Sequence, residues 1–378
     1  LFLLLLISIL LSSACTSSDD DNIAATETVQ AALATEVANQ IESLPTATQR
    51  ATASSTATIL QTMTATLTPQ PTSTPTLSPT LWYQNHQPQP ANDLLQYGLV
   101  QELPVVLYTS AEEAASKGER LRTLPGEEVY VSYQEIVEIH GSSYAEILPG
   151  GWISLDTVQE FTASQFSGIL LEEIPTMGFG WTIEPVVSVS EVPDPETTEQ
   201  VMDYYERYVV LEVLSVARDV DQQRWFEIQP GEWISDEVFA YVDGAIENPS
   251  RGATDRWILV NLTEQTLVVY QDGQPVFATL VSTGKETGWA TGEGLFTVYH
   301  KSEANDLLSP DPIVVGNYLI QDVPYILYYQ GSFALHGAYW HDNFGFPNSH
   351  GCVNLSPVDA GWLYEWANPG EWVILYRD

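Results

Sequence analysis

Residues 333–354 read FALHGAYWHDNFGFPNSHGCVN and concentrate the reactive side chains of the chain in one segment. Cys352 is one of only two cysteines, and His336 and His350 precede it by sixteen and two residues. A thiol at its reference pKa is mostly protonated at neutral pH, and a neighbouring imidazolium favours the nucleophilic thiolate. These residues predict a cysteine nucleophile paired with a histidine, and spacing alone leaves both His336 and His350 as candidates.

Gly351 lies next to Cys352 and has no side chain, so a substrate carbonyl can approach the backbone amides and leave its oxyanion there. The histidines and Cys352 also have the residue types of zinc ligands. His336 and His341 are five residues apart, however, and the chain has no Cys-x-x-Cys pair. We therefore expect no metal and no other cofactor, with His341 and His300 facing solvent.

The segment resembles the L,D-transpeptidases, whose signature is a histidine, a dozen or more residues, Ser/Thr-His-Gly-Cys, a hydrophobic residue, and Asn or Arg. Here twelve residues separate His336 from SHGCVN (349–354), and the resemblance extends over about 255–378. One departure is TGEGLF (291–296), where Gly292 replaces the proline that is usual in the family.

The resemblance implies a reaction and its residues. Cys352 would attack the carbonyl before the terminal D-residue of a peptidoglycan tetrapeptide stem, and His336, oriented by the Gly337 carbonyl, would accept and return the proton. The Gly351 and Cys352 amides, with His350, would hold the oxyanion. Other residues implied in the site are Ser349 and Asn354 as supports, and Tyr318, Tyr339 and Trp340 along the substrate groove.

In this interpretation the amine of a second stem resolves the acyl-enzyme and cross-links the cell wall. Two alternatives remain open. If water resolves the acyl-enzyme, the enzyme is an L,D-carboxypeptidase; if the catalytic domain is idle, the chain is a non-catalytic wall-binding lipoprotein.

The N-terminal residues have the pattern of an export signal. LFLLLLISILL (1–11) is too short an apolar run to span a bilayer, and small residues lead to Cys15. This resembles a bacterial lipobox, so we expect a signal peptide (1–14), a lipid anchor on Cys15 and an extracytoplasmic protein facing the cell wall. Residues 45–80 contain 22 Thr, Ser or Pro in 36 positions, which predicts a disordered stalk within 15–80.

The folded part is predicted to be mainly β. YAEILPGGWIS (144–154) and WFEIQPGEWIS (225–235) repeat a strand, a Pro-Gly turn and a return strand, 81 residues apart. They resemble bacterial Src-homology-3-like modules, so we expect two small β-barrel-like modules at 81–163 and 164–250. A β-sandwich-like catalytic domain at 251–378 should follow, with a hairpin at Asp272-Gly273 and one short helix beginning after Ser356.

The charge of the chain limits its partners. Against 50 acidic residues there are 12 Lys and Arg, a formal net charge of −38. Phosphate binding needs a basic surface, so nucleic acid is excluded as a partner. The expected partners are peptidoglycan stem peptides and, through the Cys15 lipid, the membrane; no oligomeric state is predicted.

Overall fold

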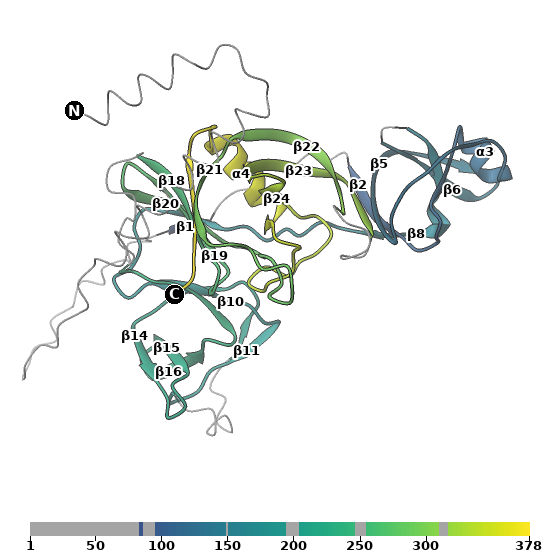
Figure 1. The fold of residues 1–378 in the computed structure, drawn as a ribbon. Helices are drawn as coiled ribbons and strands as arrows, with labels where there is room; N and C mark the ends of the chain where they lie inside the picture. The colour runs from purple at the N-terminus through teal and green to yellow at the C-terminus, as the bar shows by residue number, and fades with distance from the viewer. Residues whose placement is uncertain (1–82, 86–94, 149, 194–203, 246–254, 310–316) are drawn as a thin grey trace, which may run out of the picture. The chain divides into compact units, whose positions relative to one another are not determined.

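The computed structural model describes residues 83–85, 95–148, 150–193, 204–245, 255–309 and 317–378. These residues fall in one compact unit, Thr80–Asp378. The expected signal peptide, the lipidation at Cys15 and the stalk lie outside them. The fold is mainly β, which confirms the prediction from sequence (Figure 1). Within the described residues, no helix combines the length and apolarity that crossing a bilayer requires.

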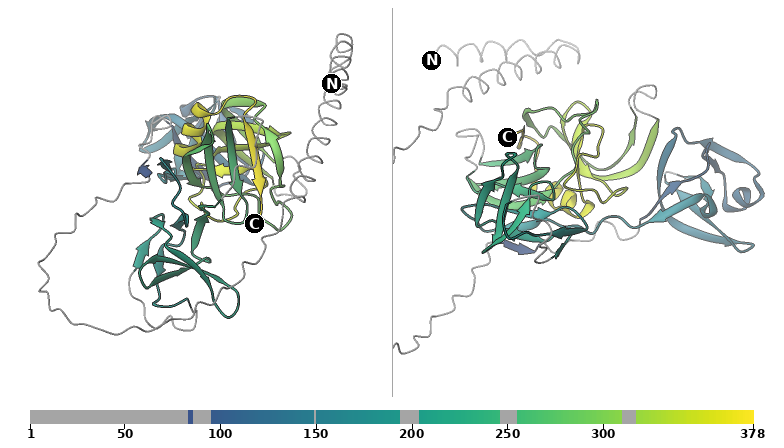
Figure 2. Two further views of the ribbon diagram at one scale, coloured as in Figure 1. Left: turned by 90° about the vertical axis from the view of Figure 1, so that its left-hand side faces the viewer. Right: turned by 90° about the horizontal axis from the view of Figure 1, so that it is seen from below.

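A seven-stranded sheet forms the centre of the C-terminal part. Its hairpin turns at Asp272-Gly273, where both residues have positive φ, as the sequence predicts. The C-terminal strand β26 inserts beside β18 in parallel, and appears in yellow among the green strands in Figure 2. In sheet order the strands are β1 (Tyr83–Asn85), β9 (Ile169–Leu171), β20 (Gln274–Leu280), β19 (Thr266–Gln271), β18 (Arg256–Asn261), β26 (Trp372–Tyr376) and β21 (Gly294–Thr297).

Both faces of this sheet are buried, which explains its nearly continuous apolar strands. On β18, Ile258 belongs to a core cluster shared with Leu335, on the side that carries the candidate site. The next residue towards the N-terminus, Trp257, belongs to a cluster shared with Trp181, in the segment predicted as the second module. The sheet is therefore a middle layer between the site and that module.

A second sheet carries the residues around the predicted nucleophile. Its strands here are β22 (His300–Leu308), β23 (Tyr318–Gln330), β24 (Phe333–Gly337) and β25 (Val353–Leu355). Helix α4 (Pro357–Trp366) follows β25 directly, and the Ser356 hydroxyl caps it by accepting the Asp359 N–H at 3.1 Å. The predicted helix and its cap are confirmed.

The first small module extends this second sheet, because β5 pairs with β23 in parallel. Its apolar core also includes Leu319 of β23. The module consists of β2 (Gln96–Val100), β3 (Val106–Tyr108), α3 (Ala111–Ser116), β4 (Arg120–Thr123), β5 (Glu128–Ile139), β6 (Ser142–Ile147), β7 (Trp152–Ser154), the 3-10 turn η1 (Leu155–Thr157) and β8 (Val158–Phe161).

The second small module has a core of its own, built around Phe226 and Phe239. Its strands are β10 (Phe179–Thr182), β11 (Val186–Ser188), β12 (Tyr204–Glu206), β13 (Val210–Glu212), β14 (Ser215–Arg218), β15 (Arg224–Gln229), β16 (Glu232–Ser235) and β17 (Phe239–Val242).

The internal repeat forms two hairpins with the same register. Glu146 pairs with Trp152 in β6–β7, and Glu227 pairs with Trp233 in β15–β16. The predicted pattern of strand, turn and return strand is confirmed in both copies. The likeness to Src-homology-3 modules stays a prediction.

Candidate active site

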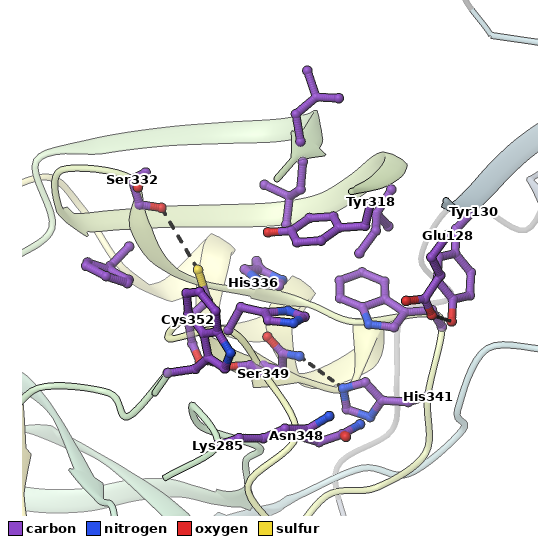
Figure 3. Close-up of a pocket in the computed structure, with 18 of the residues that line it drawn as sticks. Glu128, Tyr130, Lys285, Tyr318, Ser332, His336, His341, Asn348, Ser349 and Cys352 are labelled. Atoms are coloured by element: carbon purple, nitrogen blue, oxygen red, sulfur yellow. Dashed lines mark hydrogen bonds between the residues drawn. The ribbon is translucent and has the colours of Figure 1, made fainter. Parts of the chain in front are cut away.

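Two adjacent parallel strands bring the predicted nucleophile and base together. Strands β24 and β25 pair with His336 opposite Asn354, and Cys352 immediately precedes β25. All three residues line one cavity of about 600 Å³. Figure 3 shows the His336 and Cys352 side chains in this cavity. The pairing explains how residues sixteen positions apart line the same cavity.

The tautomer of His336 is set by the backbone carbonyl of Gly337. Its Nδ1 lies 3.3 Å from the Gly337 carbonyl oxygen, which can only accept, so Nδ1 carries the hydrogen and Nε2 keeps its lone pair. Burial lowers the pKa of His336 to about 4, although the Gly337 contact opposes that shift. At neutral pH the ring is therefore a neutral acceptor, with the carbonyl contact that the sequence predicts.

The thiol is neutral as well. Burial raises the pKa of Cys352 to about 11, and a hydrogen bond from the Ala334 backbone offsets only part of this. The sulfur lies 3.9 Å from the Ser332 carbonyl oxygen (Figure 3). Burial of the two groups thus favours a neutral thiol and a neutral imidazole over a thiolate–imidazolium pair.

Ser349 fixes the loop that precedes the thiol. Its hydroxyl donates to the Cys352 carbonyl at 2.6 Å and accepts the Gly351 N–H at 3.0 Å. The Thr291 hydroxyl donates to the Gly351 carbonyl at 3.0 Å. Gly351 has φ +117°, and a Cβ there would lie 2.5 Å from the Phe333 ring, so glycine is required.

This network corrects one prediction. We expected the Gly351 amide to be an oxyanion donor, but Ser349 already occupies that N–H. Gly351 is also absent from the residues that line the cavity. Its described role is to permit the turn that presents Cys352.

His341 is a second correction, because it lines the cavity and is only partly exposed. Its Nδ1 accepts the Asn343 N–H at 3.1 Å, so Nε2 carries the hydrogen. Nε2 lies 3.0 Å from Nδ2 of Asn354; because both nitrogens would donate, the amide must be rotated so that its oxygen faces Nε2. Burial, and next the charge of His336, lower the pKa of His341 to about 4.

The cavity brings together most of the site residues predicted from sequence. His350 lies between two aromatic rings, 5.2 Å from Tyr318 and 5.5 Å from Trp289 between centroids. The predicted residues that line the cavity are Tyr318, His336, Trp340, Ser349, His350, Cys352 and Asn354.

Tyr339, like Gly351, does not line the cavity, and it is a third correction. It is 1% exposed, does not line the cavity, and donates its hydroxyl to the Gln321 carbonyl. Its ring stacks on Tyr97 of the first module at 4.0 Å. It therefore packs beneath the cavity wall and does not line the cavity.

Sequence reasoning missed other residues of the cavity wall. Lys285 and Trp289 come from the loop after β20, close to Gly284, whose N–H donates to the Thr291 hydroxyl. Glu128 and Tyr130 come from β5, and Figure 3 shows them at the end of the cavity away from Ser332. No local pattern marks these two, because they reach the cavity through a long-range strand pairing. Within the described residues, no three His, Cys, Asp or Glu side chains gather as a possible metal site.

Residues 255–375 match the YkuD family model, which describes an L,D-transpeptidase catalytic domain. The match covers about a third of the chain, and that part is similar to an L,D-transpeptidase catalytic domain. No curated protein matches the chain.

Three solved structures illustrate the similarity. A cysteine-to-serine mutant of the Enterococcus faecium L,D-transpeptidase is 26% identical over 32% of this chain and 50% of that one, with a TM-score of 0.30. An L,D-transpeptidase from Stackebrandtia nassauensis is 32% identical over 32% and 56%, with a TM-score of 0.27. One from Mycobacterium smegmatis is 23% identical over 43% and 81%, with a TM-score of 0.31. The chain spans about half the length of the first two.

Proposed function

We propose that this protein is a cysteine L,D-transpeptidase that cross-links peptidoglycan stem peptides. One observation carries the proposal: a buried imidazole with a free Nε2 and a cysteine thiol line the same cavity from adjacent parallel strands. A base and a nucleophile in such an arrangement are what acyl transfer through a thioester requires.

The neutral resting pair favours general-base catalysis. His336 Nε2 takes the thiol proton as the sulfur attacks the stem carbonyl, so charge develops only when substrate is present. The C–N bond to the terminal D-residue then breaks, and the imidazolium returns the proton to the leaving amine. The side-chain amine of a second stem attacks the thioester, forming the new amide and restoring the thiol.

The oxyanion would be bound beside the turn that precedes β25. With the Gly351 N–H bonded to Ser349, the proposed donors are the Cys352 amide and His350. His350 is held between Tyr318 and Trp289, which fixes the plane of its ring. Pre-placed donors of this kind stabilise the tetrahedral intermediate without reorganisation.

Intact-mass spectrometry tests the proposal. Incubation with a tetrapeptide stem should give an adduct on Cys352 equal to the stem without its terminal residue, and cross-linked dimers in solution. Cys352→Ala should give neither product. Tripeptide without dimers would assign a carboxypeptidase, and an unmodified wild-type protein would refute acyl transfer.

We further propose that the enzyme acts outside the cytoplasm, anchored through lipid on Cys15. The support is the apolar run and small residues before Cys15. Expressed in a bacterial host, the wild-type protein should enter the detergent phase, and Cys15→Ala should release it to the aqueous phase. Equal partition of the wild-type protein and Cys15→Ala would refute the proposal of a lipid anchor on Cys15.

A further inference from the structure

The wall of the active-site cavity includes a carboxylate from outside the catalytic domain. Among the described residues that line the cavity, Glu128 is the only Asp or Glu, and Lys285 is the only Lys or Arg. Glu128 begins β5 of the first module, and Lys285 follows β20. One negative and one positive side chain therefore face the space that contains Cys352.

Strand register explains why Glu128 faces this space. Glu128 pairs with Tyr318, and Tyr130 with Ile320, across the parallel junction of β5 and β23. Side chains two apart on a strand project to the same face, and all four of these residues line the cavity. Glu128 is exposed, but backbone pairing places it on the side of β5 that lines the cavity.

The Glu128 carboxylate is also oriented. The Tyr130 hydroxyl donates to its Oε1 at 2.7 Å, and the Tyr130 ring lies 6.3 Å from Trp340 between centroids. Trp340 in turn lies 5.8 Å from His336. Ring contacts through Tyr130 and Trp340 therefore link the Glu128 carboxylate to His336, the proposed base. The second oxygen of Glu128, Oε2, is available to a ligand.

Glu128 and Lys285 act on the same part of the site. After burial, which lowers the pKa of His350, Lys285 lowers it further and Glu128 raises it. His350 therefore lies within electrostatic reach of both groups. A ligand bound beside His350 can therefore pair a cationic group with the Glu128 carboxylate and an anionic group with the Lys285 ammonium.

We propose that Glu128 and Lys285 form a subsite for the zwitterionic end of the stem's diamino acid, with Glu128 binding the ammonium and Lys285 the carboxylate. The inference rests on the proposed function, because it places the donor stem in the cavity. The bound ammonium is the non-reacting one, so its pairing with a carboxylate orients the stem without lowering the reactivity of the attacking amine.

Binding to the Cys352→Ala background tests the subsite without chemistry. Calorimetry would compare a tetrapeptide stem with a free distal ammonium and the same stem acetylated on that nitrogen. We expect about tenfold tighter binding of the free-amine stem, and Glu128→Gln should reduce this ratio to near one. Glu127→Gln is the matched control, because Glu127 is exposed and does not line the cavity, and it should keep the tenfold ratio.

Lys285 provides the second arm. Amidation of the distal carboxylate should weaken binding about fivefold, and Lys285→Gln should abolish that difference. The ammonium site is refuted if Glu128→Gln keeps the tenfold preference for the free-amine stem, or if the Cys352→Ala protein itself binds the free and the acetylated stems equally well. A protein that binds stems in this pattern but never forms a thioester refutes the proposed function alone, and no binding of either stem overturns both.

Discussion

The two repeat hairpins have the same register but serve different parts of the molecule. The difference lies in the strand before each hairpin. In the first module β5 has twelve residues, enough to pair with β6 and also with β2 and β23. In the second module β14 has four residues and pairs with β15 alone in its three-stranded sheet.

This difference in length changes what each module contributes. The long β5 reaches the second sheet and places Glu128 and Tyr130 in the cavity. The second module contributes Trp181 and its neighbours to the core on the opposite face of the seven-stranded sheet. The comparison leads us to expect that the first module affects substrate binding and the second affects stability.

The largest expected effect tests whether the chemistry lies outside both modules. A carbapenem should acylate Cys352, since the thiol opens the strained lactam as it opens a stem carbonyl. His336→Ala should slow this acylation by about 10²–10⁴-fold through loss of the general base. The matched control is His300→Ala, at an exposed position, which should acylate at the wild-type rate. Similar rates for the two variants, measured by intact mass over time, would remove His336 from its role.

The second module should show its effect in unfolding. Trp181 is fully buried, lies 5.2 Å from Phe179 between ring centroids, and has an indole N–H without a hydrogen-bond partner within the described residues. Trp181→Ala should lower the free energy of unfolding in urea by about 3–5 kcal/mol. Trp181→Phe should lower it less, because much of the volume remains. The folded fraction of both variants should keep the wild-type KM, and a raised KM would contradict the division between modules.

The buried Asp359 of α4 should give the fold a pH dependence. The buried Asp359 carboxylate accepts the Gly168 N–H at 2.9 Å and a hydrogen bond from Thr279. Burial raises the pKa of Asp359 from 3.8 to about 7, so folding favours the protonated form. Its contribution is complete below about pH 4 and is lost as the pH rises to about 7.

Asp359→Asn should therefore show a smaller loss of stability than the wild type between pH 4.5 and 8. Thermal melts across this range measure the slope, and the exposed Glu135→Gln controls for the removal of one charge. If Asp359→Asn and Glu135→Gln change the slope equally, the buried carboxyl is not the cause.

Local patterns predicted the elements that local forces determine. Ser356 before Pro357 predicted α4, and Asp272-Gly273 predicted its hairpin, because caps and tight turns depend on a few adjacent residues. The motif around Cys352 placed the candidate nucleophile and base. What the sequence did not predict depends on partners far along the chain. Glu128 is in the cavity because β5 pairs with a strand about 190 residues away, which no periodicity encodes.

The misplaced residues have a similar cause. His341 was expected at the surface because it lies in a polar loop, but Asn354 and Asn343 hold it inward. Tyr339 was expected in the groove because it neighbours the motif, but the first module covers it. The Gly351 amide was expected to be free, and only the folded loop shows that Ser349 uses it. Each error concerns which residue becomes the hydrogen-bond or packing partner of a side chain or amide. Adjacency in the sequence does not determine that partner.

The smallest expected effect is a change in KM that should follow a substitution in the first module and not one in the second. The Tyr97 ring stacks on Tyr339, which directly precedes Trp340, the residue that contacts His336. Tyr97→Leu should remove the ring stacking, cost about 1 kcal/mol of stability and raise KM a few-fold through a looser cavity wall. Phe226→Leu, in the core of the second module, should cost at least as much stability and leave KM at the wild-type value. Steady-state kinetics beside urea melts would separate the two, and equal KM values would show that the first module borders the cavity without shaping it.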